Sequence, residues 1–360
     1  MSNTEQTIIR PEGQGGRQMT FDIIKGFAIV LVIMGHILVL SLPEYMPPLM
    51  WMIAMVHMPL FAVISGMFAG KPLDLSLQGI VRYWWSRGLR LLLPLLLLPA
   101  LYQYIRFGGL DLPLFAILNQ YWFTYALFLT FIVFYLYRGL WTLAITRWGG
   151  GNYLIYLDIA LGVSSVLLLE YAVDMLGERL GFLVLAKVEW LYKYLVLGCW
   201  LMNYRLHERY LQNDVAGAIS GLVLAGSMLY HFAAGVETQY AAPLWHLQTI
   251  IATSGFAFVY YVVSKLSSVP GRLNSLLATL GRYSLPIYLT HYFFLPNLGD
   301  LLPWMQRAQS SEFALAADLW VALLGTIITL IPTWLVVRWV MTNKYLALLC
   351  YGEPIKKGGK

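Results

Sequence analysis

A histidine inside an apolar stretch is the first residue of this sequence that points to chemistry. The segment FDIIKGFAIVLVIMGH, Phe21 to His36, is almost wholly aliphatic apart from Asp22, Lys25 and the terminal histidine. Neutral imidazole is a general base near pH 7, and ionisable groups inside a membrane mark functional cavities by default. Asp22 and Lys25 stand three residues apart, the spacing at which side chains pair on a helix. These residue types predict proton transfer beside an ion pair.

Three histidines are expected at similar depth. Lys25 and His36 are eleven residues apart, which is close to three helical turns and about 16 Å along one helix face. By the same rise, His57 in the second apolar segment and His291 near the end of the chain also come out near mid-membrane. This layer favours a functional cavity; the alternative is that each histidine bonds a backbone carbonyl in a neighbouring helix. For Asp22 and Lys25 the alternatives are a favourable helix dipole and snorkelling to the interface.

A basic segment follows the second apolar run. The stretch KPLDLSLQGIVRYWWSRGLRLLLP carries Arg82, Arg87 and Arg90 at helical spacing, the last two as an R-x-x-R pair. Arginine forks bind phosphates in a bidentate manner, so these residues form a candidate site for an anionic ligand. The alternative is that the arginines only set the orientation in the membrane.

Aromatic residues are candidates for binding a sugar. Trp122, Tyr125 and Trp245 lie towards the expected outer ends of two apolar segments, where their rings could stack on a sugar. An ordinary interfacial aromatic belt explains the same positions. Asp158 lies within a further apolar segment and requires a cationic or hydrogen-bonding partner, which the sequence does not identify.

The elements that position these residues are membrane-spanning helices. Of the 360 residues 59% are hydrophobic and only 12% are charged, whereas soluble domains average about 25% charged residues. Apolar runs of about 20 residues, the length that crosses a bilayer, occur along the whole chain. We therefore predict an all-α integral membrane protein, a bundle of about ten transmembrane helices. The predicted helices span residues 23–42, 49–70, 89–107, 118–137, 153–172, 188–204, 215–233, 244–265, 276–296 and 315–341.

Basic residues predict the orientation, because short cytoplasmic loops carry the excess of Lys and Arg. With the N-terminus inside, most of the 24 lysines and arginines fall on the inner side. The ones left outside are Arg106, Arg179, Lys187, Lys193 and Arg307. Both termini, including Asn3 and Lys356, are therefore predicted to be cytoplasmic. The predicted organisation is a polar tail, a transmembrane domain and a basic tail, over residues 1–20, 21–345 and 346–360.

Charge and motif content exclude two kinds of partner. The net charge of +6 follows from the membrane orientation, so no nucleic-acid partner is expected. Neither CxxC nor HExxH occurs, so no metal is expected.

Five segments, in order, resemble one family of membrane enzymes. The five segments are FDIIKGFAIVLVIMGH, HMPLFAVISGMF, RYWWSRGLRLLLP, YWFTYALF and YSLPIYLTHYFF. The first of them contains a basic residue, Lys25, followed by ten residues and then His36. Together they resemble the membrane-bound acyltransferase 3 family, especially its fucose-O-acetylase-like members, the polysaccharide O-acetyltransferases.

The resemblance implies transfer of an acyl group, usually acetyl, from cytoplasmic acyl-CoA to a sugar hydroxyl of a surface or secreted glycan. By position, His36 corresponds to the catalytic histidine and Lys25 to its basic partner. Arg87 and Arg90 correspond to the residues that hold the CoA phosphates. The family most often has arginine where this chain has Lys25, and lysine keeps the charge but loses the bidentate fork.

The sequence thus predicts an acyl-CoA-dependent O-acetyltransferase of the bacterial cytoplasmic (inner) membrane, surrounded by membrane lipid. Acetyl-CoA is the expected co-substrate, and a glycan or lipid-linked sugar is the expected acceptor. His36 fits both a general base and an acetylated intermediate. One rival is a transporter or flippase of a glycan or lipid-linked intermediate, although the inverted repeats of such folds are not evident here. A second rival is a non-catalytic scaffold for glycan assembly, which would not need a buried histidine layer. The predicted site residues are His36, Lys25 and Asp22 for catalysis, Arg82, Arg87 and Arg90 for the donor, and His57, Trp122, Tyr125 and His291 for the substrate.

Overall fold

The computed structural model is helical throughout the part of the chain that it describes. Seven helices there are long and apolar enough to cross a membrane: Met19–Ser41, Leu49–Ala69, Leu77–Phe107, Trp122–Trp148, Tyr153–Leu176, Leu247–Leu266 and Ala314–Thr342. The chain is therefore a polytopic membrane protein. Asn3 and Lys356, both predicted to be cytoplasmic, lie outside the described residues. The structure describes residues 14–42, 45, 47–109, 120–149, 151, 153–177, 179–233, 245–267, 269 and 271–355.

Seven of the ten predicted segments coincide with these seven spans, and the predicted segments 188–204 and 215–233 coincide with two further helices, α8 and α10. The helices are α1 (Gln14–His36), α2 (Pro48–Ala69), α3 (Leu77–Leu91), α4 (Leu93–Phe107), α6 (Trp122–Trp148), α7 (Tyr153–Leu176), α8 (Leu185–Asn203), α9 (Leu206–Arg209), α10 (Asp214–Ala233), α11 (Trp245–Leu266), α12 (Arg272–Arg282), α13 (Ser284–Thr290), α14 (Leu302–Gln309), α15 (Ala314–Thr342) and α16 (Lys344–Tyr351). Short turns of other helix types are η1 (Ile37–Ser41), η2 (Gly181–Leu183), η4 (His291–Phe294) and η5 (Gly299–Leu301).

The prediction of one continuous helix over residues 276–296 is wrong. The segment consists of the end of α12, then α13, then the 3₁₀ turn η4. Tyr283 separates α12 from α13, with φ −102° and ψ 17°. Pro286 lacks an N–H, and the first turn of a helix is where a missing donor is tolerated, so a new helix begins at Ser284.

Two segments expected to connect helices are themselves helical. After α2, the Ser76 side chain caps α3 by accepting a hydrogen bond from the Gly79 N–H at 3.1 Å, so the helix begins well before the predicted position. α6 continues as far as Gly149, whose φ of +75° ends it. Arg138, predicted in a cytoplasmic connection, therefore lies within α6 and is fully buried.

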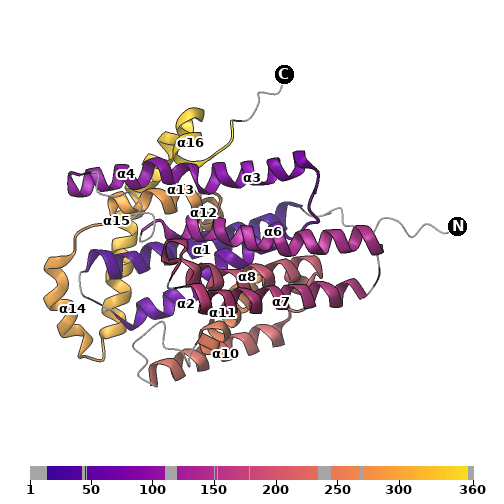
Figure 1. Cartoon of the computed structure of the whole chain (residues 1–360). Helices are drawn as coiled ribbons and strands as arrows, with labels where there is room; N and C mark the ends of the chain where they lie inside the picture. The colour runs from indigo at the N-terminus through magenta and orange to yellow at the C-terminus, as the bar shows by residue number, and fades with distance from the viewer. Residues whose placement is uncertain are drawn as a thin grey trace.

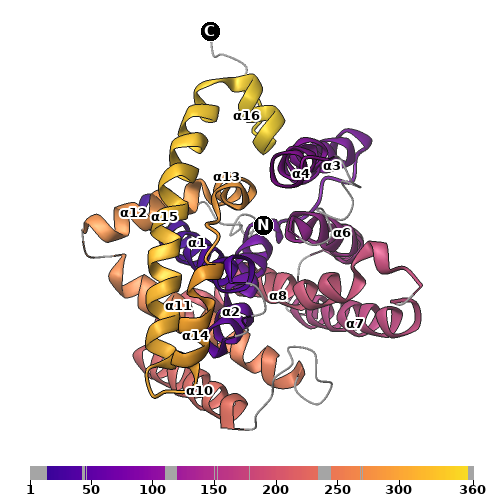
Figure 2. The same cartoon turned by 90° about the vertical axis from the view of Figure 1, so that its left-hand side faces the viewer.

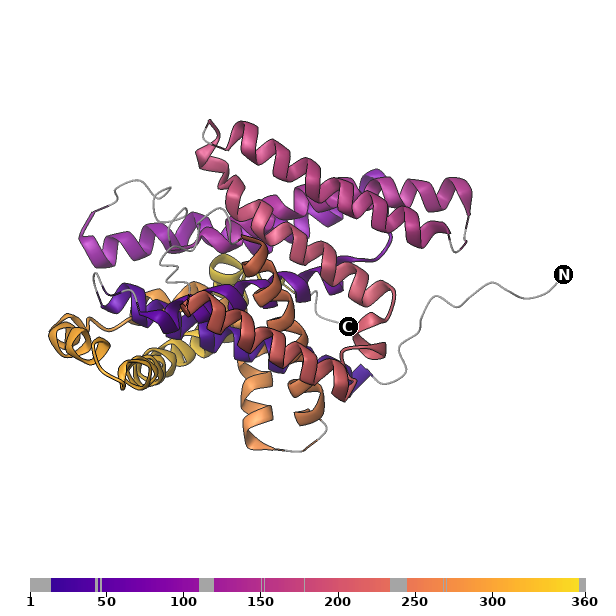
Figure 3. The same ribbon diagram turned by 90° about the horizontal axis from the view of Figure 1, so that it is seen from below.

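The centre of the bundle is formed by α1 and α2. In Figure 2 they lie between α3 and α4, α7 and α8, α10 and α11, and α15. Figure 3 shows α7 and the α11–α12 pair on opposite sides of this centre. Figure 1 shows α3, α4 and α16 along one edge of the molecule. The helices that carry Lys25, His36 and His57 thus lie at the centre of the arrangement.

Glycines let the central helices pack closely on their neighbours. Gly26 and Gly281 lie where α1 crosses α12, and Gly66 and Gly198 lie where α2 crosses α8. A methyl group on any of the four would lie 1.8–1.9 Å from a carbonyl oxygen of the facing helix. Small residues allow such close backbone approach between membrane helices. These crossings fix α1, which carries Asp22, Lys25 and His36, and α2, which carries His57.

Candidate active site

Two histidines meet at the end of α1. The Nδ1 of His36 lies 2.7 Å from the Nε2 of His291, which begins the η4 turn. The two ring planes differ by 7°. His291 is completely buried, whereas His36 keeps part of its surface accessible. The π-helical turn Ile37–Ser41 follows His36 directly, and such turns are frequent at functional sites. The prediction that His36 and His291 lie at one depth is confirmed.

Tyrosines surround this pair. Tyr292 places its hydroxyl oxygen 3.5 Å from the Nε2 of His36 and donates its proton to the main-chain carbonyl of Gln120. Tyr288 donates to the same carbonyl at 3.1 Å, and its ring centre is 6.0 Å from that of His291. Neither tyrosine is among the predicted site residues. Their spacing of three and one residues from His291 in YSLPIYLTHYFF is the signal that could have identified them.

His57 is held within its own helix. Its Nδ1 lies 2.6 Å from the carbonyl oxygen of Ile53, one turn earlier in α2, and the residue is 7% exposed. The alternative of a bond to a carbonyl of a neighbouring helix is therefore wrong for His57, because its carbonyl partner belongs to its own helix. The next residue, Met58, lines the cavity described below.

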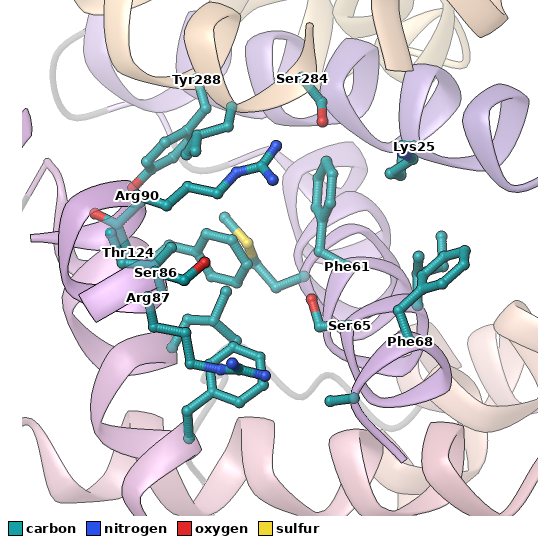
Figure 4. Close-up of a pocket in the computed structure, with 18 residues that line it drawn as sticks. Lys25, Phe61, Ser65, Phe68, Ser86, Arg87, Arg90, Thr124, Ser284 and Tyr288 are labelled. Carbon is teal, nitrogen blue, oxygen red and sulfur yellow. The ribbon is translucent and has the colours of Figure 1, made fainter. Parts of the chain in front are cut away.

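A cavity of about 410 Å³ lies between α1, α2, α3, α6 and α13 (Figure 4). On α2 its lining recurs every three or four residues from Met58 to Ala69, which is one helix face about 16 Å long. Most of the wall is apolar. The lining residues are Lys25, Met58, Phe61, Ile64, Ser65, Phe68, Ala69, Ser86, Arg87, Arg90, Leu91, Phe123, Thr124, Leu127, Phe131, Ser284, Leu285 and Tyr288.

Three basic side chains line this cavity. Arg87 and Arg90 come from α3 on one side and Lys25 comes from α1 on the opposite side (Figure 4). The Nζ of Lys25 is 2.6 Å from an oxygen of Asp22, so the predicted ion pair is confirmed. Arg90 is 3.6 Å from a carboxylate oxygen of Glu353, beyond α16. No local pattern in the sequence indicates this contact, because 263 positions separate the two residues.

Arg87 is held by aromatic rings. Its guanidinium carbon lies 3.5 Å from the centre of the Tyr83 ring and 4.5 Å from that of Phe131. None of the ion pairs found in the described part of the chain involves Arg87, and its Nε is buried without a hydrogen-bond partner there. Aromatic faces stabilise a guanidinium and fix its plane without occupying its N–H groups. The side chain is thus prepared to bind an anion.

Other predicted site residues do not line the cavity. Arg82 is exposed on α3. Trp122 and Tyr125 lie in the first turn of α6, and the Nζ of Lys187 lies 4.7 Å from the centre of the Trp122 ring. The side chain of Trp245 lies outside the part of the structure that is described.

The partner of Asp158 is Arg138. Both side chains are 0% exposed, and the Nη1 of Arg138 donates to the Oδ1 of Asp158 at 3.0 Å. The hydroxyl groups of Tyr137 and Tyr204 donate to the same carboxylate at 2.5 and 2.6 Å. The Nη2 of Arg138 donates to the carbonyl oxygen of Gly70 at 2.6 Å, where α2 ends. This cluster fixes one end of the helix that forms the cavity wall.

Comparison with known families decides the enzyme class. A family model described as "Acyltransferase domain" (Acyl_transf_3) matches residues 20–338, which is most of the chain. The chain belongs to this acyltransferase family. It is a multi-pass membrane acyltransferase, and the resemblance inferred from the five segments is confirmed.

Two bacterial proteins are similar over part of this acyltransferase. The nodulation protein NolL of Sinorhizobium fredii (strain NBRC 101917 / NGR234) is 31% identical over 136 residues, which are 34% of this chain and 37% of that protein. The nodulation protein NolL of Mesorhizobium japonicum (strain LMG 29417 / CECT 9101 / MAFF 303099) is 33% identical over 141 residues, 34% of this chain and 36% of that protein. The matched region spans little more than a third of either relative. No solved structure matches the chain.

Proposed function

We propose that the protein transfers an acetyl group from cytoplasmic acetyl-CoA to a sugar hydroxyl of a surface or secreted polysaccharide, such as an exopolysaccharide or an O-antigen. The observation that carries this proposal is the cavity. It is lined by three basic side chains and by Tyr288, whose carbonyl bonds His291, the partner of His36. An anionic acyl donor and a base would thus meet along one wall.

The donor fits the charge and shape of the cavity. CoA carries phosphates at one end and its thioester at the other, joined by a flexible arm. Arg87, Arg90 and Lys25 supply charge for the phosphates, and the apolar face of α2 supplies about 16 Å of wall for the arm. Lys25 and His36 are also separated by about 16 Å along α1, so an arm of that length would carry the acetyl group towards the base.

The chemistry requires a base that reaches the acceptor hydroxyl. We assign this role to His36, whose ring stays partly accessible, with Lys25 and Asp22 as the charged pair on the same helix. His57, Trp122 and Tyr125 are assigned to the acceptor side. Arg82 is assigned to the approach of the donor, because an exposed cation attracts phosphates over a distance.

The proposed setting is the bacterial cytoplasmic membrane, crossed ten times. The seven long spans are completed by α8, by α10 and by the broken segment of α12 and α13. Both tails, residues 1–20 and 346–360, are placed in the cytoplasm around a transmembrane domain of residues 21–345. Lys25, Arg87 and Arg90 all count as inner residues by the charge rule, and their convergence on one cavity supports this orientation.

The test combines binding with product analysis. CoA should raise the melting temperature of the purified protein, because a ligand that binds only the folded state stabilises it. Polysaccharide from a deletion strain should lose an acetyl group while its backbone is still made. Cells with His36→Ala should show the same loss, although the variant still inserts and binds CoA. A transporter would instead show no response to CoA, and its deletion would stop export of the whole glycan.

A further inference from the structure

The hydrogen bonds of His291 determine where its proton lies. Its Nδ1 is 2.7 Å from the carbonyl oxygen of Tyr288 and 3.2 Å from that of Ile287. A carbonyl oxygen only accepts, so Nδ1 carries the proton. In a neutral imidazole the other nitrogen then has a free lone pair, which makes the Nε2 of His291 an acceptor.

The ring nitrogen of His36 that carries the proton follows from its contact with His291. Its Nδ1 lies 2.7 Å from the Nε2 of His291, so Nδ1 must donate to that lone pair. The ring centres are 5.0 Å apart and the planes differ by 7°. That separation equals the nitrogen–nitrogen distance plus the radius of each ring, so the rings meet edge to edge in nearly one plane. The hydrogen bond is therefore close to linear, and the Nε2 of His36 is left with the lone pair.

The free nitrogen is on the accessible histidine. His36 is partly exposed, whereas His291 is completely buried and cannot touch a substrate. The Tyr292 hydroxyl lies 3.5 Å from the Nε2 of His36 and donates its proton to the carbonyl of Gln120. The lone pair of Nε2 is thus not engaged by that hydroxyl proton.

We propose that His291 is a positioning residue for the acetyl transfer proposed above. By accepting a hydrogen bond from Nδ1, it holds His36 in the tautomer whose Nε2 can take a proton from the acceptor. This role replaces the predicted contact of His291 with substrate and rests on the proposed function. It parallels the general logic of catalytic triads, in which a buried partner fixes the tautomer of the base.

In the proposed transfer, His36 takes up one proton and then returns it. The Nε2 of His36 takes the proton of the acceptor hydroxyl as its oxygen attacks the thioester carbonyl carbon of acetyl-CoA. The carbon–sulfur bond breaks, and the CoA thiolate leaves and takes the proton back from Nε2. The products are the O-acetyl sugar and CoA thiol, and His36 returns to its neutral tautomer. While Nε2 is protonated, the hydroxyl oxygen of Tyr292, 3.5 Å away, can accept a hydrogen bond from it.

The test compares two substitutions at one position in the full-length enzyme. His291→Leu removes the acceptor, and kcat should fall about 10²–10⁴-fold, the range that general-base catalysis contributes. The KM for acetyl-CoA should stay within about twofold, because His291 does not line the donor cavity. His291→Gln can place an oxygen near the Nδ1 of His36, so its kcat should be at least about tenfold above that of His291→Leu. A general loss of packing would lower both variants alike.

The tautomer can also be read directly. In ¹⁵N-histidine-labelled wild-type enzyme, with His36→Ala used for assignment, the His36 signal should show protonated Nδ1 and unprotonated Nε2. Protonated Nε2 in the neutral wild-type ring would overturn the inference, even if His291→Leu fails to fold. The inference would also be overturned if His291→Leu kept the wild-type kcat while His36→Ala was inactive. That outcome would leave the proposed function intact. Absence of acetyl transfer by the wild-type enzyme would instead refute the proposed function, and the NMR measurement would still decide the tautomer.

Discussion

Replacing Asp158 by alanine should destabilise the protein more than almost any other single change to a carboxylate in this chain. Asp158 and Arg138 are both 0% exposed, and removing one partner of a buried ion pair costs about 3–5 kcal/mol, because the other charge stays buried and uncompensated. Two tyrosine hydroxyls also lose their acceptor. Each buried group left without a partner lowers the stability further, so we expect Asp158→Ala to lower the free energy of unfolding by about 4–5 kcal/mol.

The assay is reversible unfolding of the purified protein in mixed micelles with increasing SDS. Asp174→Ala is the matched control, because it removes an exposed carboxylate from the same helix and should change the free energy of unfolding by less than about 0.5 kcal/mol. The double variant Arg138→Met, Asp158→Leu should recover more than half of the loss, since apolar residues often replace a buried ion pair at little cost.

A functional consequence follows from the bond between Arg138 and the carbonyl of Gly70. That bond holds the end of α2, whose face forms the cavity wall, so Asp158→Ala should weaken CoA binding in the protein that remains folded. If Asp158→Ala lowers the free energy of unfolding by less than about 1 kcal/mol, the reasoning is refuted, because the Arg138–Asp158 pair would then have to be solvated in the folded protein.

Three further predictions test the site and the fold. Arg87→Ala with Arg90→Ala should weaken CoA binding by at least about tenfold in calorimetry, whereas Arg82→Ala should have a smaller, salt-dependent effect because its side chain is exposed; equal affinity in all variants would contradict the donor site. Reporters fused to the two termini should both report the cytoplasm, and opposite sides would disprove the ten-helix topology. Gly66→Ala should lower thermal stability strongly because its methyl group would meet the α8 backbone, whereas Gly139→Ala has nothing within 4 Å and should not; equal melting temperatures would contradict this packing.

Much of the fold could be predicted from the sequence because a bilayer imposes length and polarity on each segment. The seven long spans coincide with predicted segments for this reason. The break at Tyr283 was missed, because hydropathy does not distinguish a straight helix from one that restarts around Pro286. Arg138 was misplaced because counting basic residues assumes that they lie in connections. Its carboxylate partner is in another helix, and only the packing reveals it.

The candidate site was predictable where it follows helical spacing and hidden where it depends on packing. The Asp22–Lys25 pair follows from an i,i+3 spacing, and the similar depth of His36 and His291 follows from the rise per residue. The contact of Glu353 with Arg90 joins distant parts of the chain and carries no periodic signal. The hydrogen-bond direction between the two histidines required the carbonyl partners of His291, which no sequence pattern specifies.

The rigidity of α1 relates the donor end of the site to the base. Lys25 and His36 stand on one helix about 16 Å apart, and Gly26 locks that helix against the α12 backbone. Such close packing of the two backbones opposes sliding of α1 past α12. Under the proposed function, a donor must carry its anionic group and its acyl carbon at the two ends of an arm of matching length, as a CoA thioester does. A small acyl phosphate holds its charge next to the acyl carbon, so it can occupy one end of this path but never both. If His36 is the base and the basic residues bind the donor, as proposed above, selection of the donor by length would follow from helix packing and would require no closing movement.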